Sequence, residues 1–172
     1  MDDEDANRQL TRVPTQSDLV KVAREFNRLG VAYVVVGGFA INRLGFVRAT
    51  DDLDLLIARD KANQALVKQA LDILPDKAAR ELAGDDLAQW LVVRVNDDIT
   101  VDLMTVACGV TFDEVRDHIE YAEIEGVRIP FADATMMLKM KQGWRVKDVE
   151  DRSFLQELLK NRPSPGAPPP AG

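Results

Sequence analysis

Three aspartates lie in segments whose other residues are apolar. Asp52 and Asp54 begin the run Asp-Leu-Asp-Leu-Leu-Ile, and Asp102 interrupts the apolar run 99–106. Residues two apart on a β-strand point to the same face, so Asp52 and Asp54 should project together. If a neighbouring strand sets Asp102 across from them, three carboxylates meet, and each pair repels by about 4 kcal/mol at 4 Å and an effective dielectric of 20. Such a group must take up protons, meet basic side chains or bind a cation.

Carboxylate oxygens with no histidine or cysteine beside them select Mg²⁺ or Mn²⁺ over zinc. The alternative is a set of solvated acids at a strand end that pair with Arg48 or Arg94. Aspartate is common in this chain, and Asp3-x-Asp5 shows that the bare spacing arises by chance. The apolar context of the three acids therefore carries the interpretation, and both alternatives stay open.

Two glycines, Gly37 and Gly38, follow the apolar run 31–36. A glycine pair lets the backbone approach a ligand closely, and free N–H groups at a helix start attract phosphate. The same pair can equally form a tight turn. The surrounding residues lack the glycine patterns of a dinucleotide fingerprint or a Walker loop.

The elements that must position these residues follow from hydrophobic periodicity and from the residues that end each run. Helices are expected over 17–29 with Ser17 as N-cap, 39–44, 60–74, 133–142 and 148–160, with a short one capped by Thr111. Strands are expected over 31–36, 53–57, 90–95 and 99–106, with a strand or hairpin around Glu125-Gly126. A helical crossover and a hairpin in one chain predict an α/β (α+β) fold with a mixed sheet.

Length and composition indicate one domain. The 172 residues are 46% hydrophobic and 30% charged, which suffices for a single core. The domain is expected over 16–161, between a flexible acidic arm (1–15) and a disordered Pro-rich tail (162–172). No apolar run is long enough for a membrane span and the N-terminus is unlike a signal peptide, which predicts a cytoplasmic protein without membrane partners. The single cysteine, Cys108, excludes an internal disulfide and fits reducing surroundings.

Together these motifs resemble the signature of the DNA polymerase beta-like nucleotidyltransferase superfamily. The resemblance rests on Gly37-Gly38, on Asp52-Leu53-Asp54 after thirteen intervening residues, and on the strand-borne Asp102. It is strongest toward small bacterial members, which include minimal nucleotidyltransferases, toxin-type enzymes of toxin–antitoxin modules and antibiotic-modifying enzymes. The matching stretch covers roughly residues 31–158.

A second part of the resemblance lies near the C-terminus. The family often has a lysine-bearing helix followed by Arg-x-Lys-Asp before a last helix. Leu138-Lys139-Met140-Lys141 and then Arg145-Val146-Lys147-Asp148 are similar to that pattern, with either lysine as the match. The expected architecture is a nucleotidyltransferase-like mixed β-sheet flanked by helices, with a short C-terminal helical segment.

The resemblance implies an enzyme that transfers a nucleoside monophosphate from a nucleoside triphosphate, such as ATP, to a hydroxyl, with release of pyrophosphate. Asp52 and Asp54 would hold two Mg²⁺ ions, or Mn²⁺, and Asp102 would hold the one that activates the acceptor and could take its proton. The implied nucleotide-binding residues are Gly37, Gly38, Arg48, Thr50, Lys139 or Lys141, Arg145 and Lys147. For Thr50 the alternative is a plain turn hydroxyl.

The acceptor stays open among a tRNA, a protein and a small hydroxylated molecule, and a toxin-type enzyme would have an antitoxin partner. The net charge of −7 argues against a large RNA footprint. The alternative function is a non-catalytic nucleotide-binding or antitoxin-like interaction module of the same fold. A plain structural domain with solvated acids is the third possibility.

Six other residues attract attention by their type. His118 is interpreted as a surface residue, Trp90 as core, and Met136, Met137 and Met140 as core at helical spacing. Trp144 lies beside basic residues, where it either stacks on a base or packs the last two helices.

Overall fold

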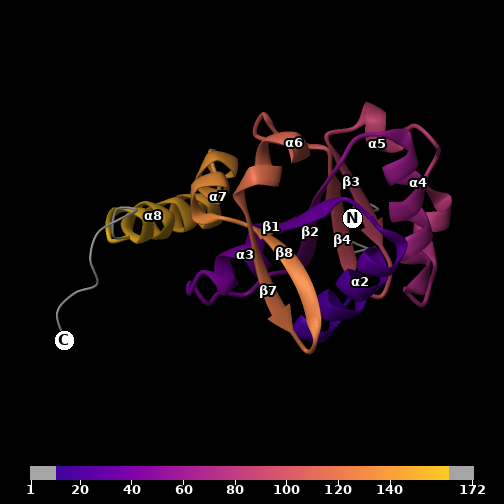
Figure 1. Cartoon of the computed structure of the whole chain (residues 1–172), viewed down its shortest axis with the longest axis horizontal. Coiled ribbons are helices and arrows are strands. Elements are labelled where there is room, and N and C mark those ends of the chain that lie inside the picture. The colour runs from indigo at the N-terminus through magenta and orange to yellow at the C-terminus, as the bar shows by residue number, and fades with distance from the viewer. Residues whose placement is uncertain (1–10, 163–172) are drawn as a thin grey trace, which may run out of the picture.

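The centre of the molecule is a six-stranded mixed sheet with the strand order β3-β4-β2-β1-β8-β7 (Figure 1). The computed structural model describes residues 11–162. The sheet strands are β1 (Tyr33–Val36), β2 (Asp52–Ile57), β3 (Val92–Asn96), β4 (Thr100–Met104), β7 (Ile119–Ile124) and β8 (Val127–Ala132). A separate small ribbon is formed by β5 (Val106–Ala107) and β6 (Val110–Thr111). The mixed sheet predicted from the sequence is confirmed.

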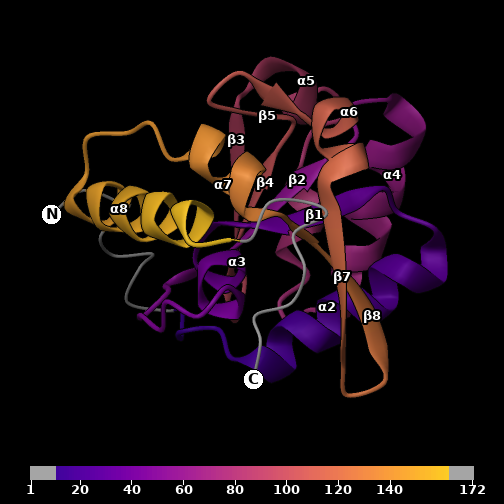
Figure 2. The same ribbon diagram turned by 60° about the vertical axis from the view of Figure 1, so that its left-hand side comes forward.

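The longer helices are α2 (Gln16–Leu29), α3 (Gly37–Arg43), α4 (Lys61–Ala70), α7 (Ala134–Met140) and α8 (Val146–Lys160). Short helical turns are α5 (Asp86–Gln89), α6 (Phe112–Val115) and the 3-10 turns η1 (Leu71–Ile73), η2 (Ala78–Glu81) and η3 (Arg116–His118). Figure 2 shows α3, α7 and α8 gathered on one side of the molecule and α2 and α4 on the other. Among the described residues, no helix combines the length and apolar character that a membrane span requires.

The strand pairing explains why the middle of the sheet is dry. Strand β2 pairs antiparallel with β1 and parallel with β4, so it has hydrogen-bonded neighbours on both sides. Leu53 and Leu55 of β2 and Val101 and Leu103 of β4 are fully buried on the face opposite to the aspartates. The alternation of leucine and aspartate in β2 therefore separates a core face from a polar face.

The first helix begins two residues earlier than predicted. The N-cap residue of α2 is Thr15, not Ser17, and the Asp18 carboxylate accepts a hydrogen bond from the Thr15 backbone N–H at 2.7 Å. The preceding residues 11–15, expected as part of a loose arm, are anchored. The Arg12 guanidinium binds both Asp18 and Asp98, at 2.7 and 2.8 Å, and the Arg12 N–H donates to the Asp98 carbonyl. Residues 1–10 and 163–172 of the expected arm and tail lie outside the described range.

Several further boundaries differ from the sequence predictions. Gly37 and Gly38 form the first turn of α3 instead of preceding a helix over 39–44. The segment expected as a loop after Pro75 contains the short helices η2 and α5. Trp90, predicted as core, is 63% exposed because β3 is an edge strand that begins only at Val92.

The hairpin alternative for the segment around Glu125-Gly126 is confirmed. Strands β7 and β8 pair antiparallel along their whole length, and Glu125 and Gly126 both have positive φ in the connecting turn. The sequence indicated the turn but not the extent of the two strands. β7 is partly exposed along its length, which weakens its hydrophobic alternation.

Candidate active site

One row of residues crosses four strands of the sheet and contains two of the three aspartates. Val36 of β1 is paired with Asp54 of β2, Asp54 with Asp102 of β4, and Asp102 with Arg94 of β3. Residues directly opposite one another in a sheet point to the same face. Asp52 lies two residues before Asp54 in β2 and so shares this face. The structure thus brings all three predicted carboxylates to one face of two adjacent strands.

Arg94 is the cation that meets these carboxylates. Its Nε and Nη2 atoms donate to Oδ1 and Oδ2 of Asp102, both at 2.9 Å, and Nη2 also lies 3.3 Å from Oδ2 of Asp52. The pairing of the acids with Arg94, one of the alternatives from the sequence, is therefore present. Within residues 11–162, no three histidine, cysteine, aspartate or glutamate side chains are gathered closely enough to hold a metal ion.

The charge on Asp54 is only partly compensated. Burial, followed by the neighbouring Asp102 and Asp52 carboxylates, raises the pKa of Asp54 to about 7, although Lys141 and Arg94 oppose the shift. The donor chemistry of the three carboxylates fits a hard divalent cation, because all are oxygen ligands and Asp54 would be relieved by added positive charge. The bidentate bond from Arg94 places a positive charge on both oxygens of Asp102.

The glycine pair makes room for site residues. Gly37 has a φ of +65°, and a Cβ built there would overlap the carboxyl group of Asp54. A Cβ on Gly38 would overlap the hydroxyl and Cβ of Thr50 in the same way. The first turn of α3 therefore lies directly against β2 and the residues that precede it, which side chains at these two positions would prevent. Thr50 itself donates from Oγ1 to the Asp52 carbonyl, a local bond of the kind expected for a turn hydroxyl.

Four of the basic residues singled out in the sequence are paired with an acid. Arg48 forms a bidentate pair with Asp151 of α8 at 2.7 and 2.8 Å. Lys141 lies 3.1 Å from Asp151 and 3.5 Å from Asp148. Arg145 bonds to Asp148 at 3.1 Å, and Lys147 to Asp51 at 3.3 Å. Lys141 faces the aspartates, whereas Lys139 is exposed on α7 and lines neither cavity beside them.

The buried acids of α8 hold these cations in place. Asp151 has a side chain with no exposed surface, and burial alone would raise its pKa. Hydrogen bonds from Arg48 and Lys141 outweigh that effect and hold the pKa of Asp151 below its usual range. Arg145 has its pKa raised, first by the bond to Asp148 and also by the charges of Asp54 and Asp52. The carboxylates of the sheet and the cations of the α7–α8 connection therefore act on one another across the cleft.

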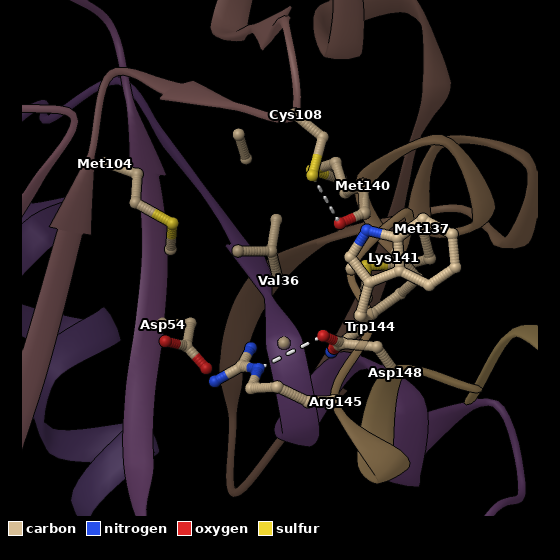
Figure 3. Close-up of a pocket in the computed structure, with 13 residues that line it drawn as sticks. Val36, Asp54, Met104, Cys108, Met137, Met140, Lys141, Trp144, Arg145 and Asp148 are labelled. Carbon is tan, nitrogen blue, oxygen red and sulfur yellow. Dashed lines mark hydrogen bonds and ion pairs between the residues drawn. The ribbon is translucent and has the colours of Figure 1, made fainter. Parts of the chain in front are cut away.

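The cleft between the sheet face and the α7–α8 connection has a charged part and an apolar part. The charged part, about 310 Å³, is lined by the three aspartates with Arg94, Lys141, Arg145 and Lys147 among others. The apolar part, about 320 Å³, is lined by Val36, Met104, Cys108, Met137, Met140 and Trp144, and it shares Asp54 and Arg145 with the charged part. Figure 3 shows the Arg145 guanidinium between Asp54 and Asp148, with Met104, Val36 and Cys108 on the walls above.

Of the remaining sequence interpretations, some are confirmed and one is wrong. Met136, Met137 and Met140 are buried as predicted, although two of them also line the apolar part of the cleft. Trp144 is 94% exposed, so the alternative that it packs the last two helices together is wrong. His118 is an exposed surface residue as predicted, and its Nδ1 lies 3.2 Å from Asp133 Oδ2.

Sequence reasoning missed three contributors to the site. Asp151 was not singled out, although its spacing of three from Asp148 on a helix places two acids on one face. Met104, at the end of β4, and Cys108, between β5 and β6, were not considered as site residues, because their local sequence carries no sign of the cavity that they line. Arg94 was considered only as a surface partner, and its bidentate geometry depends on the β3–β4 register.

The mixed sheet carries an Asp-x-Asp pair and a third aspartate on the neighbouring parallel strand, with a short glycine-started helix against them. Comparison with solved structures shows that this is a nucleotidyltransferase-like fold. The antibiotic-resistance factor ANT(2″)-Ia, solved with adenylyl-2″-tobramycin, superposes with a TM-score of 0.58 at 17% identity, over 83% of this chain and 88% of that one.

Two further solved structures show the same fold. The lincosamide antibiotic adenylyltransferase LnuA, solved with lincomycin bound, gives a TM-score of 0.57 at 15% identity, over 86% of this chain and 99% of that one. TM1012 from Thermotoga maritima, assigned as a nucleotidyltransferase, gives 0.56 at 14% identity, over 90% and 99%. No family model matches the sequence, and no curated protein does either. At these identities the likeness is one of fold.

Proposed function

We propose that the protein is a divalent-metal-dependent nucleotidyltransferase that moves a nucleoside monophosphate from a nucleoside triphosphate to a hydroxyl acceptor. The observation that supports it most is the placement of Asp52, Asp54 and Asp102 on one sheet face that opens into a cleft. Phosphoryl transfer depends on alignment and charge neutralisation more than on covalent help, and a rigid sheet face supplies the first of these.

The three carboxylates are proposed to have different roles because of their positions. Asp52 and Asp54 would hold Mg²⁺ or Mn²⁺, which when bound neutralises the phosphates and makes the acceptor hydroxyl more acidic. Asp102 is buried in the neighbouring strand and is the acid placed to accept the acceptor's proton once Arg94 has released it. Asp54 must lose its own proton to act as a ligand, since its pKa lies near 7.

The cations of the α7–α8 connection are the proposed partners of the triphosphate. The charged part of the cleft is lined by Lys141, Arg145 and Lys147, and also by Arg48. A triphosphate carries more charge than any one carboxylate, so it competes well for Arg145 and Lys147, whose side chains are exposed. Arg48 and Lys141 are held by the buried Asp151 and are proposed to contribute a fixed positive field.

The apolar part of the cleft is proposed to take the base or an apolar portion of the acceptor. Its methionines and the exposed Trp144 ring offer a flat, polarizable surface for a heteroaromatic ring. ATP is the first triphosphate to test, because ANT(2″)-Ia was solved with an adenylyl product and LnuA is an adenylyltransferase. A small hydroxylated acceptor fits best with the net charge of −7, whereas a tRNA or protein acceptor, a toxin role, an antitoxin partner and a cytoplasmic location stay predictions from the sequence.

A second candidate is a nucleotide-binding module of the same fold that does not turn over. The specific observation in its favour is that Arg94 occupies both oxygens of Asp102, so the described residues hold no ready group of three metal ligands. Such a module would still bind nucleotide through the cations of the cleft. It would leave the triphosphate intact.

The test is incubation of the full chain with each α-³²P-labelled nucleoside triphosphate, Mg²⁺ and a pool of RNA, protein and small hydroxylated acceptors. We expect label transfer with pyrophosphate release, lost at least ~100-fold in Asp52→Ala, because two ligand oxygens disappear from the site. Asp72→Asn is the control, since Asp72 pairs with Arg80 on the surface away from the cleft. Thermal stabilisation by nucleotide without any transfer would favour the binding module instead.

A further inference from the structure

Arg94 is bound to the residues that a metal would need. We propose that Arg94 is an internal counter-cation that holds Asp102 and Asp52 together in the metal-free protein and is displaced when a divalent cation binds. The inference rests on the proposed metal-dependent function. It assigns to Arg94 a positioning role toward the metal, which acts through the carboxylates and not on the reacting atoms.

The geometry of the pair places one hydrogen bond on each oxygen of Asp102. The guanidinium presents two parallel N–H groups to the two carboxylate oxygens, at 2.9 Å each. A divalent cation of the Mg²⁺ type binds carboxylate oxygen at about 2.0–2.1 Å, and beside these oxygens it would be repelled by the guanidinium charge. Arg94 and a metal ion therefore compete for Asp102.

The surroundings allow one partner to leave while the other stays. Asp102 is fixed in the middle strand β4 with its side chain only 9% exposed, whereas Arg94 lies on the edge strand β3 and its side chain is 39% exposed. The guanidinium can swing toward solvent without any change in the sheet hydrogen bonds. The exchange needs a side-chain rotation alone, which is fast compared with chemistry.

The charge balance explains why such a residue is needed. Without Arg94, the three carboxylates on this face would repel one another, opposed by Lys141 and by Arg145 across the cleft. Arg94 also contacts Asp52, so a single guanidinium bridges the first and third aspartates. Its presence keeps the metal-free site assembled, and its loss must weaken the metal-free fold while making the carboxylates more available to a cation.

The proposal is tested on the full chain after removal of metal with EDTA, with Mn²⁺ as the probe. We expect Arg94→Gln to bind Mn²⁺ about tenfold more tightly than wild type in an EPR titration at pH 7.5. We also expect its Tm in EDTA to fall by several degrees and to return to the wild-type value, or above it, in saturating Mn²⁺. A merely structural arginine would lower Tm in both conditions and would not raise the affinity for Mn²⁺.

Two matched variants complete the design. Arg80→Gln removes another bidentate arginine–aspartate pair, one that lies on the surface with Asp72, and should change neither Mn²⁺ affinity nor the dependence of Tm on metal. Arg94→Lys keeps the positive charge but loses the two parallel N–H donors of the guanidinium, so it should give an intermediate affinity for Mn²⁺. This variant replaces Arg94→Gln if Arg94→Gln fails to fold.

The outcomes separate this inference from the proposed function. Equal or weaker Mn²⁺ binding by folded Arg94→Gln, beside measurable binding by wild type, overturns the counter-cation role and leaves metal-dependent transfer standing. Absence of Mn²⁺ binding in every variant overturns the proposed function and this inference with it. Binding that appears only after Arg94 is replaced supports the competition in its strongest form.

Discussion

Gly37 has a left-handed backbone with φ +65° and lies directly against the carboxyl group of Asp54. A glycine pair after a strand indicates either a phosphate-binding approach or a tight turn, and the structure shows a further reason for it. The backbone of α3 needs the space that a Cβ would occupy, because Asp54 and Thr50 fill it from the other side. At the scale of single residues, the glycine motif is therefore needed because the residues of the aspartate segment pack directly against it.

This fit predicts the effect of adding one methyl group. Gly37→Ala must strain the backbone and also push Asp54 aside, so we expect a loss of more than ~2 kcal/mol of stability together with weaker Mg²⁺–nucleotide binding. Gly30→Ala is the matched control, because Gly30 has φ +75° with open space around its Cβ position. It should cost only the backbone term, about 1 kcal/mol, and leave binding unchanged. The measurements are denaturant unfolding and a nucleotide thermal shift, and equal effects of the two variants would contradict the steric argument.

At the scale of elements, α8 is attached to the rest of the molecule through buried charge. The helix buries Asp148, Asp151 and Leu155. The two acids bind cations from outside α8 and the N-cap residue Arg145. Arg48 reaches Asp151 from the segment before β2, a separation of 103 residues along the chain. The acids of α8 thereby connect the C-terminal helix to the loop that precedes the first two aspartates.

The connection predicts an unequal cost for two aspartate truncations. Asp151→Ala leaves Arg48 and Lys141 without their buried partner, so we expect a loss of about 3–5 kcal/mol in the free energy of unfolding. Asp113→Ala removes an exposed pair with Arg116 and should cost less than ~1 kcal/mol. Urea unfolding followed by circular dichroism compares them. Similar small losses for both would show that α8 is not held by these charges.

At the scale of the whole molecule, the ionisation of Asp54 lowers the free energy of unfolding at neutral pH. The pKa of Asp54 is about 7 in the folded chain, against an ordinary value of 3.8 for an aspartate. Between these values the folded state binds more protons than the unfolded state, so the contribution of Asp54 to stability is lost as the pH rises toward and through 7. The carboxylates thus favour the folded chain least where they are charged, which is the condition in which a cation is bound most strongly.

The pH prediction is made for the metal-free protein in EDTA. The free energy of unfolding of wild type, relative to that of Asp54→Asn, should decrease between pH 5 and pH 8 by at most about 2.7 kcal/mol, since the folded pKa is about 7. The asparagine variant supplies the baseline, because it retains the other titrating groups and lacks this one. Denaturant titrations at four pH values measure the difference, and a constant difference across the range would contradict the raised pKa.

Much of the fold was predictable because its causes are local. Apolar runs and the residues that end them indicated the sheet strands and the main helices in their order along the chain, with boundary errors of a few residues. For β7 and β8 this holds for the hairpin alternative. Trp90 was misplaced because an edge strand exposes one side to solvent, and no local pattern says which strand is at the edge. Ser17 was taken as the N-cap because Thr15 and Ser17 are equally good local candidates.

By itself, the sequence determined the mixed sheet, the aspartates on one face of β2 and the third aspartate on a later strand, since strand alternation is a property of neighbouring residues. Only the tertiary structure decided which cation meets which acid. Arg94 reaches Asp102 through the β3–β4 register, and Arg48 reaches Asp151 across most of the chain. Such pairings depend on the relative placement of elements that are distant in sequence, and packing decides which of several basic residues of equal charge reach each acid.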